Sequence, residues 1–189
     1  DMDAVGADHF HMLADRLQIG HLGSPWGDGS HAQRAPRRND AAARAALDDH
    51  WSRLTGNHPG KPQTIEVLGR KVAIPLASMG VARFGFNDLC DVPLAANDYL
   101  HIAHAFHTIL IDDIPMLTPD RRDVARRFIT LVDALYDNRI CLIASAAAEP
   151  SHLYTAGDGV ELFERTASRL TEMRSEAYLT GHSGGRSRH

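Results

Sequence analysis

The chain is poor in the residues and motifs that define specialised classes of protein. Its two cysteines, Cys90 and Cys141, lie far apart and have no metal-ligand spacing. This excludes a disulfide scaffold and makes a reducing compartment the default, although a single disulfide stays open. No apolar run approaches the ~18 residues that a membrane span needs. The start has no basic region followed by an apolar one, so we expect no signal peptide.

Lysine is almost absent, and with it one common nucleotide-binding motif. The only lysines are Lys61 and Lys71. Neither lies in the phosphate-loop pattern G-x-x-x-x-G-K-[ST], which occurs nowhere in the chain. No G-x-S-x-G elbow is present either, so a serine hydrolase is unsupported. Position 1 is Asp rather than Met, which leads us to expect a cut or incomplete chain.

The composition is that of an ordinary soluble globular protein. The 189 residues suit one large domain or two small ones, with 43% hydrophobic and 23% charged residues. Lys and Arg number 20 against 24 Asp and Glu, which gives a net charge of −4. These values exclude wholesale disorder and a generally basic nucleic-acid binder.

The first 38 residues are the least regular part. We expect a short helix near His9–Leu17 and then a glycine-rich loop. The loop carries a basic cluster (Arg34, Arg37 and Arg38) that either contacts phosphate or an acidic partner or is merely solvated. Asn39 is predicted to cap a second helix that ends at Gly56. Its buried stripe consists of Ala43, Leu47, Trp51 and Leu54.

Residues 61–180 have the pattern of an α/β domain. A hairpin is predicted over Thr64–Pro75 with its turn at Gly69-Arg70. A third strand over Val81–Phe86, a helical turn over Asp88–Asp91 capped by Asn87, and a helix starting at Asn97 or Asp98 follow.

The next segment is the most regular. Thr108–Ile111 is apolar throughout, as in a strand covered on both faces. Thr118-Pro119 starts a helix that runs to about Asn138, and Arg139–Ser145 is a second apolar strand. Strand, helix and strand at this spacing predict parallel pairing and a right-handed crossover.

A last helix is expected over Val160–Thr180, with Phe163, Ala167, Leu170, Met173 and Ala177 facing inward. We therefore predict an α/β fold, in which a mixed sheet with a β-hairpin and a right-handed parallel βαβ unit is flanked by helices. The predicted organisation is an irregular segment 1–60 with one or two helices, an α/β domain 61–180, and a disordered tail 181–189. The segment Asn57–Pro62 is the candidate boundary.

Asp112-Asp113 is the first candidate for chemistry. Apolar strand residues followed by acids resemble a Walker B motif, in which a carboxylate at the strand end faces Mg²⁺. Ser145 is predicted to lie at the same sheet edge. The alternative is that the acids cap a turn before Pro115, and the missing phosphate loop favours it.

Two further sets of side chains are candidates for binding. His101, His104 and His107 have spacing that could share a metal, but no Glu or Cys completes the set, so surface and core-edge histidines are the better explanation. Arg165 and Arg169 are one helical turn apart. They could reach a phosphate, a neighbouring subunit's nucleotide or a carboxylate, or they pair locally with Glu161, Glu164 or Glu172.

Several phrases, taken together, resemble one family. They are Met79–Phe84, Phe86–Cys90, Asp98–Leu100, Phe106–Pro115, Arg126–Asp133, Leu135–Asp137, Ala144–Ala146 and Phe163–Met173. Their order and sequence are similar to the C-terminal part of the ZapE-like cell-division ATPases, bacterial relatives of the mitochondrial AFG-one-like ATPases. The resemblance is good over Thr64–Leu179, loose over Ala42–Gly56 and poor before that.

The resemblance implies an AAA-type P-loop enzyme that binds ATP with Mg²⁺ and hydrolyses it. In bacteria such enzymes are tied to the division ring at the inner membrane, and in mitochondria to protein quality control. Family members carry the phosphate loop, the principal Walker B acids and a Ser-Asn sensor upstream of the matched region. None of these is in this chain. We therefore expect a C-terminal fragment that is inactive alone, with no catalytic or metal-binding residue and no cofactor of its own.

Four residues match family motifs, namely Asp113, Ser145, Arg165 and Arg169. They are predicted to contact nucleotide or a neighbouring subunit. The unit from Ile109 to Ser145 is hypothesised to be a nucleotide-free βαβ layer that packs on the catalytic core. Expected partners are the missing N-terminal ATPase core, division-ring proteins and further copies of the protein, but neither nucleic acid nor a membrane span. The expected location is the cytoplasm, with peripheral attachment to the inner membrane during division.

One alternative from a different class stays open. The chain could be a stand-alone protein-interaction module that kept the family's accessory domain and lost its motor.

Overall fold

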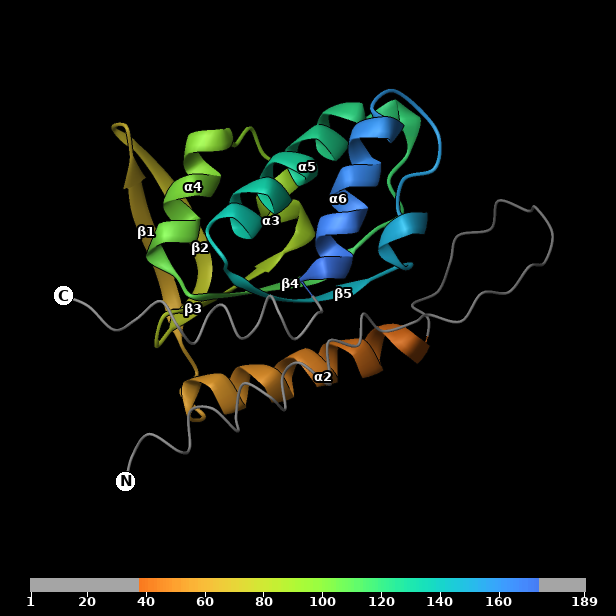
Figure 1. The fold of residues 1–189 in the computed structure, drawn as a ribbon. Coiled ribbons are helices and arrows are strands. Elements are labelled where there is room, and N and C mark those ends of the chain that lie inside the picture. Colours follow the sequence, from red (N-terminus) through yellow and green to blue (C-terminus); the bar gives the residue numbers. More distant parts are fainter. Residues whose placement is uncertain (1–37, 174–189) are drawn as a thin grey trace.

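The computed structural model describes residues 38–173, which form an α/β fold with helices on both faces of one sheet (Figure 1). The helices are α2 (Arg38–Thr55), α3 (Phe86–Cys90), α4 (Ala96–Ala105), α5 (Arg122–Asp137) and α6 (Val160–Glu172), with short 3₁₀ turns η1 (Pro119–Arg121) and η2 (Pro150–His152). The strands are β1 (Lys61–Val67), β2 (Arg70–Ser78), β3 (Val81–Gly85), β4 (Thr108–Ile114) and β5 (Cys141–Ala146). The predicted helix at His9–Leu17, the cluster from Arg34 to Arg38, Ala177 and the tail 181–189 lie outside the described side chains.

The five strands form one mixed sheet in the order β1-β2-β3-β4-β5. The pairs β1–β2 and β2–β3 are antiparallel, whereas β3–β4 and β4–β5 are parallel. The α/β class, the hairpin and the parallel βαβ unit through α5 are thereby confirmed. Because β3, β4 and β5 follow one another in the same direction across the sheet, their order never reverses.

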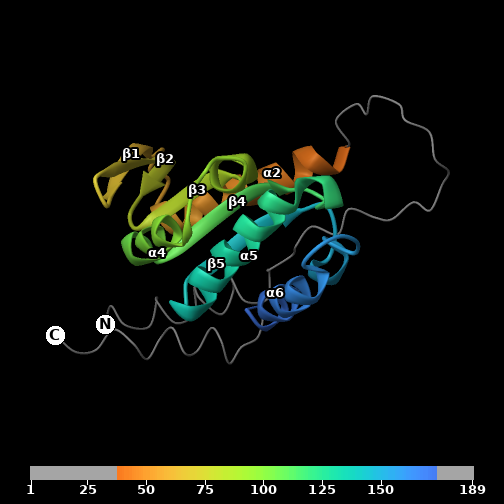
Figure 2. The same ribbon diagram turned by 90° about the horizontal axis from the view of Figure 1, so that it is seen from above.

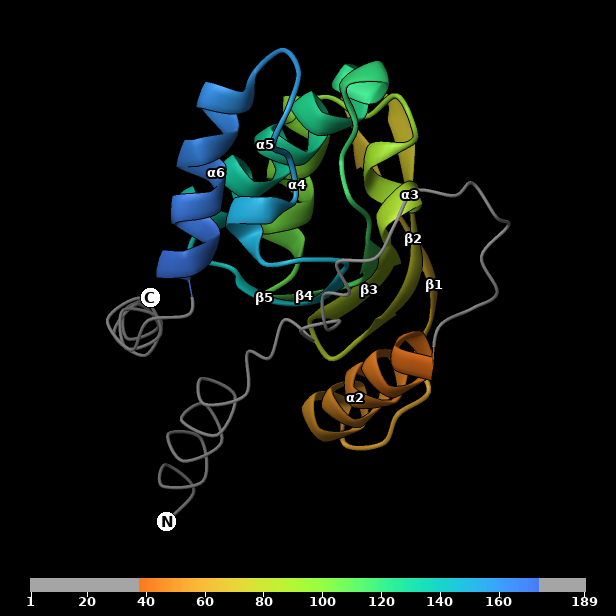
Figure 3. The ribbon, with the colours of Figure 1, turned by 90° about the vertical axis from the view of Figure 1, so that its right-hand side faces the viewer.

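Helices cover the two faces of the sheet unequally. Of the described helices, Figure 3 shows α2 on one face and α3 to α6 on the other. Leu110 of β4 packs with Leu47 and Trp51 of α2, whereas its neighbours Ile109 and Ile111 belong to the larger cluster under the other helices. All three β4 side chains are fully buried. The prediction that this strand is covered on both faces is therefore confirmed.

The turn of the first hairpin differs from its prediction. Val67 pairs with Arg70, so the turn is Leu68-Gly69 and not Gly69-Arg70. Both turn residues have positive φ, 49° for Leu68 and 78° for Gly69. A two-residue turn with this conformation matches the twist of antiparallel strands, and glycine adopts it at little cost. The prediction placed Gly69 first in the turn, whereas in the structure Leu68 occupies the first left-handed position and Gly69 the second.

Several element ends were also predicted wrongly. The first helix begins at Arg38, so Asn39 lies inside it and is not its cap. The helix predicted over Asp88–Asp91 is α3, which begins at Phe86 because the Asp88 carboxylate accepts a hydrogen bond from the Gly85 amide (2.8 Å). In both cases the sequence places a capping residue near the start but does not fix which residue turns first.

The two cysteines are free and buried, and they belong to different apolar clusters. Burial raises the pKa of the Cys90 thiol from 9.0 to about 12, and that of the Cys141 thiol from 9.0 to about 11. A thiol that stays protonated and shielded is a poor nucleophile. The disulfide that the sequence left open is not formed.

We expect the folded protein to leave both thiols unreacted with Ellman's reagent near pH 8, and the denatured chain to release two equivalents. Between pH 9.0 and about 11 the unfolded chain loses thiol protons that the folded protein keeps, so the free energy of unfolding should fall as pH rises through this range. Rapid labelling of either cysteine without loss of circular dichroism would contradict their burial.

Candidate functional site

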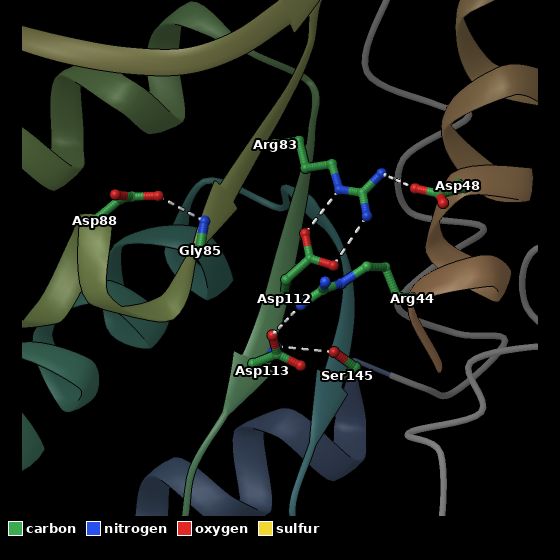
Figure 4. Close-up of polar contacts among 8 residues, drawn as sticks. All are labelled: Arg44, Asp48, Arg83, Gly85, Asp88, Asp112, Asp113 and Ser145. Atoms are coloured by element: carbon green, nitrogen blue, oxygen red, sulfur yellow. Dashed lines mark hydrogen bonds and ion pairs between the residues drawn. The ribbon is translucent and has the colours of Figure 1, made fainter. Parts of the chain in front are cut away.

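The Asp112-Asp113 pair forms a bulge at the carboxyl end of β4. Ile111 pairs with Ala144 and Ile114 pairs with Ala146, so the two acids stand opposite Ser145 alone. Asp113 has a positive φ of 60°, and its amide donates a hydrogen bond to Ser145 Oγ (2.8 Å; Figure 4). Bulges of this kind redirect side chains at functional edges of sheets. The structure thus brings Asp113 and Ser145 together at the edge where the sequence predicted them.

Asp112 is held by an arginine of the neighbouring strand. Arg83 of β3 donates from Nε (2.7 Å) and Nη2 (2.9 Å) to the two oxygens of Asp112, and from Nη1 (2.6 Å) to Asp48 of α2. The side chains of Arg83 and Asp112 are only 14% and 15% exposed. The hydrogen bond to Asp112 is the main cause that raises the pKa of Arg83 above its ordinary value. Both oxygens of Asp112 are therefore occupied by a permanently charged partner.

Asp113 is paired more weakly. Its carboxylate lies 3.1 Å from Nη2 of Arg44, and both side chains are more than half exposed. An exposed ion pair of this kind contributes little, about 0–1 kcal/mol. Arg44, like Asp48, comes from α2, so the helix that covers this face of the sheet also supplies partners to the strand edge (Figure 4).

These residues do not by themselves fit a nucleotide with Mg²⁺. Each acid of the Walker B-like pair is matched to an arginine, and no cluster of three or more His, Cys, Asp or Glu within residues 38–173 could hold a metal. The parallel strands in this described range also lack the order reversal at which open α/β sheets form a ligand crevice. Nucleotide binding by Asp113 and Ser145 stays a prediction.

Arg165 and Arg169 lie on α6 and face α5. Arg165 Nη2 is 3.0 Å from Asp133 Oδ2, and Arg169 also contacts Asp133. The Arg169 guanidinium stands 4.8 Å from the ring centroid of Tyr136. Their described partners are thus aspartates of α5, Asp133 for both arginines and also Asp137 (3.7 Å) for Arg169, and not the local glutamates. Sequence spacing missed Asp133 because only the packing of α6 on α5 brings it near.

Comparison with known proteins assigns the amino-acid sequence to a family. The sequence model of the AFG1-like ATPases matches residues 27–182, which is most of the chain. The chain belongs to the AFG1-like ATPase family. This confirms the resemblance that the quoted phrases carry.

Curated AFG1-like relatives come from bacteria and eukaryotes. Cell division protein ZapE of Escherichia coli K12 is 37% identical over 141 residues, which cover 72% of this chain and 36% of ZapE. An uncharacterized protein of Schizosaccharomyces pombe is 37% identical over 127 residues (67% and 28%), and Lactation elevated protein 1 homolog B of Danio rerio is 33% identical over 163 residues (69% and 32%). The chain thus spans about a third of the length of these relatives. No solved structure matches it significantly.

The three histidines that the sequence offered as metal ligands make separate local contacts in this AFG1-like chain. His101 Nδ1 lies 2.7 Å from the Asn97 carbonyl, and His104 Nε2 lies 3.0 Å from Asn138 Oδ1. His107 bridges Thr108 Oγ1 (2.8 Å) and the Met79 carbonyl (3.0 Å). Within the described part of the chain, none of the helices is long and apolar enough to cross a membrane.

The side chains at this strand edge form one cluster, which consists of Arg44, Asp48, Arg83, Asp112, Asp113 and Ser145. The sequence analysis missed three of them, namely Arg44, Asp48 and Arg83. Arg83 is distant from Asp112 in sequence and meets it only because β3 and β4 pair in parallel, with Gly85 beside Asp112. A signal existed in the arginine that interrupts the apolar residues of β3, since a charge within a buried strand requires a partner.

Proposed function

We propose that this chain is the accessory α/β domain of an ATP-hydrolysing AFG1-like protein, and that it does not hydrolyse ATP alone. The observation that carries the proposal is the bidentate pairing of Asp112 with Arg83, because it already engages both oxygens of one of the two Walker B-like carboxylates with a cation. The absence of a phosphate-loop pattern from the 189 residues supports the same conclusion. In the whole protein, ATP and Mg²⁺ would bind to a separate ATPase core.

For the whole protein we propose a role in cell division. Two of its relatives, at 37% identity, are named cell division protein ZapE. Its proposed partners are the ATPase core, division-ring proteins and further copies of itself. Its proposed place is the cytoplasm and, during division, the inner membrane.

The two arginines of α6 divide between two roles in this proposal. The side chain of Arg165 is 53% exposed, so it is accessible to a nucleotide or a neighbouring subunit. Arg169 is 22% exposed and is held between Asp133 and the Tyr136 ring. We assign the contact within the assembly to Arg165 and the attachment of α6 to α5 to Arg169.

The purified chain should show no Mg²⁺-dependent ATP turnover above a no-protein blank. We expect no turnover because Asp112 and Asp113 are already paired with arginines, and because the sequence contains no phosphate loop to bind the nucleotide. Phosphate release measured for the wild type and for Asp113→Ala tests this expectation, with intact E. coli ZapE as the positive control. Turnover by the wild type that the substitution abolishes would sink the proposal.

The reading frame upstream of this chain distinguishes the proposed accessory domain from the alternative, a stand-alone interaction module. Residues 38–173 have a buried core of their own, which is what a domain that works without a motor needs. An in-frame G-x-x-x-x-G-K-[ST] upstream favours the accessory domain. A start codon next to Asp1 favours the module.

A further inference from the structure

The outer edge of β5 carries backbone groups that have no partner within the described part of the chain. Among the strands of residues 38–173, β5 is the last of the sheet and pairs only with β4. The Cys141 amide donates to the His107 carbonyl (3.1 Å), so Cys141 and Ile143 direct their N–H and C=O toward β4. By the alternation of a strand, Leu142 and Ala144 direct theirs outward. No residue of 38–173 bonds to these outward groups.

The opposite edge of the sheet is protected, and β5 is not. β1 carries Lys61, Pro62 and Glu66, all exposed, and such residues prevent another strand from pairing. β5 has neither charge nor proline, and five of its six residues are buried. An apolar unprotected edge is typical of a strand that gains a neighbour in the complete protein.

Helix α6 lies on the face of the sheet where it could pack on a further strand added beside β5. Figures 2 and 3 show α6 as the outermost helix on the β5 side of the sheet, beyond α5. In parallel α/β sheets a helix of this layer covers the strand pair beneath it, as α5 does between β4 and β5. The contact of Arg169 with Asp133 attaches α6 to α5 in this position.

We propose that an extended segment from the part of the AFG1-like polypeptide outside this chain adds to β5 as a sixth strand. This proposal rests on the proposed function and says where the accessory domain meets the rest of the protein. ZapE has the necessary length, since the match covers only 36% of it. The segment should be uncharged at its centre, because Leu142 and Ala144 offer it backbone groups and an apolar edge.

A second copy of this chain fits the edge less well. Joining two β5 strands would place them about 4.8 Å apart, whereas packed helices need about 8–10 Å between axes. The two α6 helices would meet on the same face of the joined sheet, and each exposes Glu161 and Glu164. A lone strand without its own helix avoids both conflicts.

Hydrogen exchange resolved to single amides tests the proposal on this chain and on intact E. coli ZapE. In this chain the Leu142 and Ala144 amides should exchange at least about 100-fold faster than the inward Ile143 amide. In ZapE the amides that align with Leu142 and Ala144 should be as protected as their inward neighbour. Fast exchange at these positions in both proteins would overturn the proposal.

Light scattering of the same sample identifies the occupant. A monomer with exposed Leu142 and Ala144 amides is expected. A dimer in which they are protected would assign the edge to a second copy and overturn the proposal. Neither measurement involves ATP turnover, so a failure here is distinct from a failure of the proposed function.

Matched proline substitutions provide an independent test. Ala144→Pro removes only an outward N–H, so this chain should keep its melting temperature within about 3 °C. Ile143→Pro removes an N–H bonded to β4 and should unfold the chain. In ZapE, proline at the position that aligns with Ala144 should lower the melting temperature by about 5 °C or more. If ZapE tolerates that proline as well as this chain does, no strand pairs there.

Discussion

Replacing Asp98 with alanine is expected to lower the free energy of unfolding by about 3 kcal/mol. The Asp98 carboxylate is fully buried and accepts both Arg70 Nη2 (2.7 and 2.8 Å) and the Ala95 amide (2.7 Å). It therefore ties the β1–β2 hairpin to the first turn of α4. Alanine would leave the Ala95 amide without its acceptor and a cavity where the carboxylate was. Urea unfolding followed by circular dichroism measures the loss.

Two substitutions serve as controls for Asp98→Ala. Asp98→Asn keeps an oxygen for the Ala95 amide but loses the charge that Arg70 contacts, so about half the loss is expected. Asp123→Ala removes the partner of Arg127 in a pair whose aspartate is 64% exposed, and should cost under about 0.5 kcal/mol. If Asp98→Ala cost no more than Asp123→Ala, the carboxylate would not hold the hairpin to α4.

Replacing Asp112 with alanine is the second large effect, with an expected loss of about 2 kcal/mol. It removes two hydrogen bonds from an arginine that is 14% exposed, and leaves Arg83 with Asp48 alone. The loss is smaller than at Asp98 because Asp48 is 62% exposed and can follow the guanidinium toward water. Thermal and urea unfolding of the purified variant measure it.

The neighbouring acid is the matched control for Asp112. Asp113→Ala breaks the exposed pair with Arg44 and places alanine at a positive φ of 60°, and together these should cost about 1 kcal/mol. Arg83→Leu combined with Asp112→Leu removes both charges, and should recover much of the stability that Asp112→Ala loses. Equal losses for Asp112→Ala and Asp113→Ala would show that the Arg83 pair is not the one that matters.

The elements that the sequence predicted well are those whose pattern reflects burial. The apolar stretch Thr108–Ile111 has the pattern of a strand covered on both faces. The strand, helix and strand between Ile109 and Ser145 have the spacing of a parallel βαβ unit. Element ends were less certain, as at Asn39 and Gly69-Arg70. There, several neighbouring residues can begin a helix or occupy a turn at nearly equal cost, and the surrounding packing decides among them.

At the candidate site, too, some features could be predicted from the sequence and others depend on tertiary packing. The sequence by itself determined the family, the strand ending in Asp112-Asp113, and the shared edge with Ser145, because these depend on local pattern and strand direction. Only the tertiary structure decided which cations meet those acids and that Arg165 and Arg169 meet Asp133. Such partners lie far apart in the chain, and no sequence spacing relates them. The same packing decided that β5 ends the described sheet with its outward N–H and C=O groups unpaired.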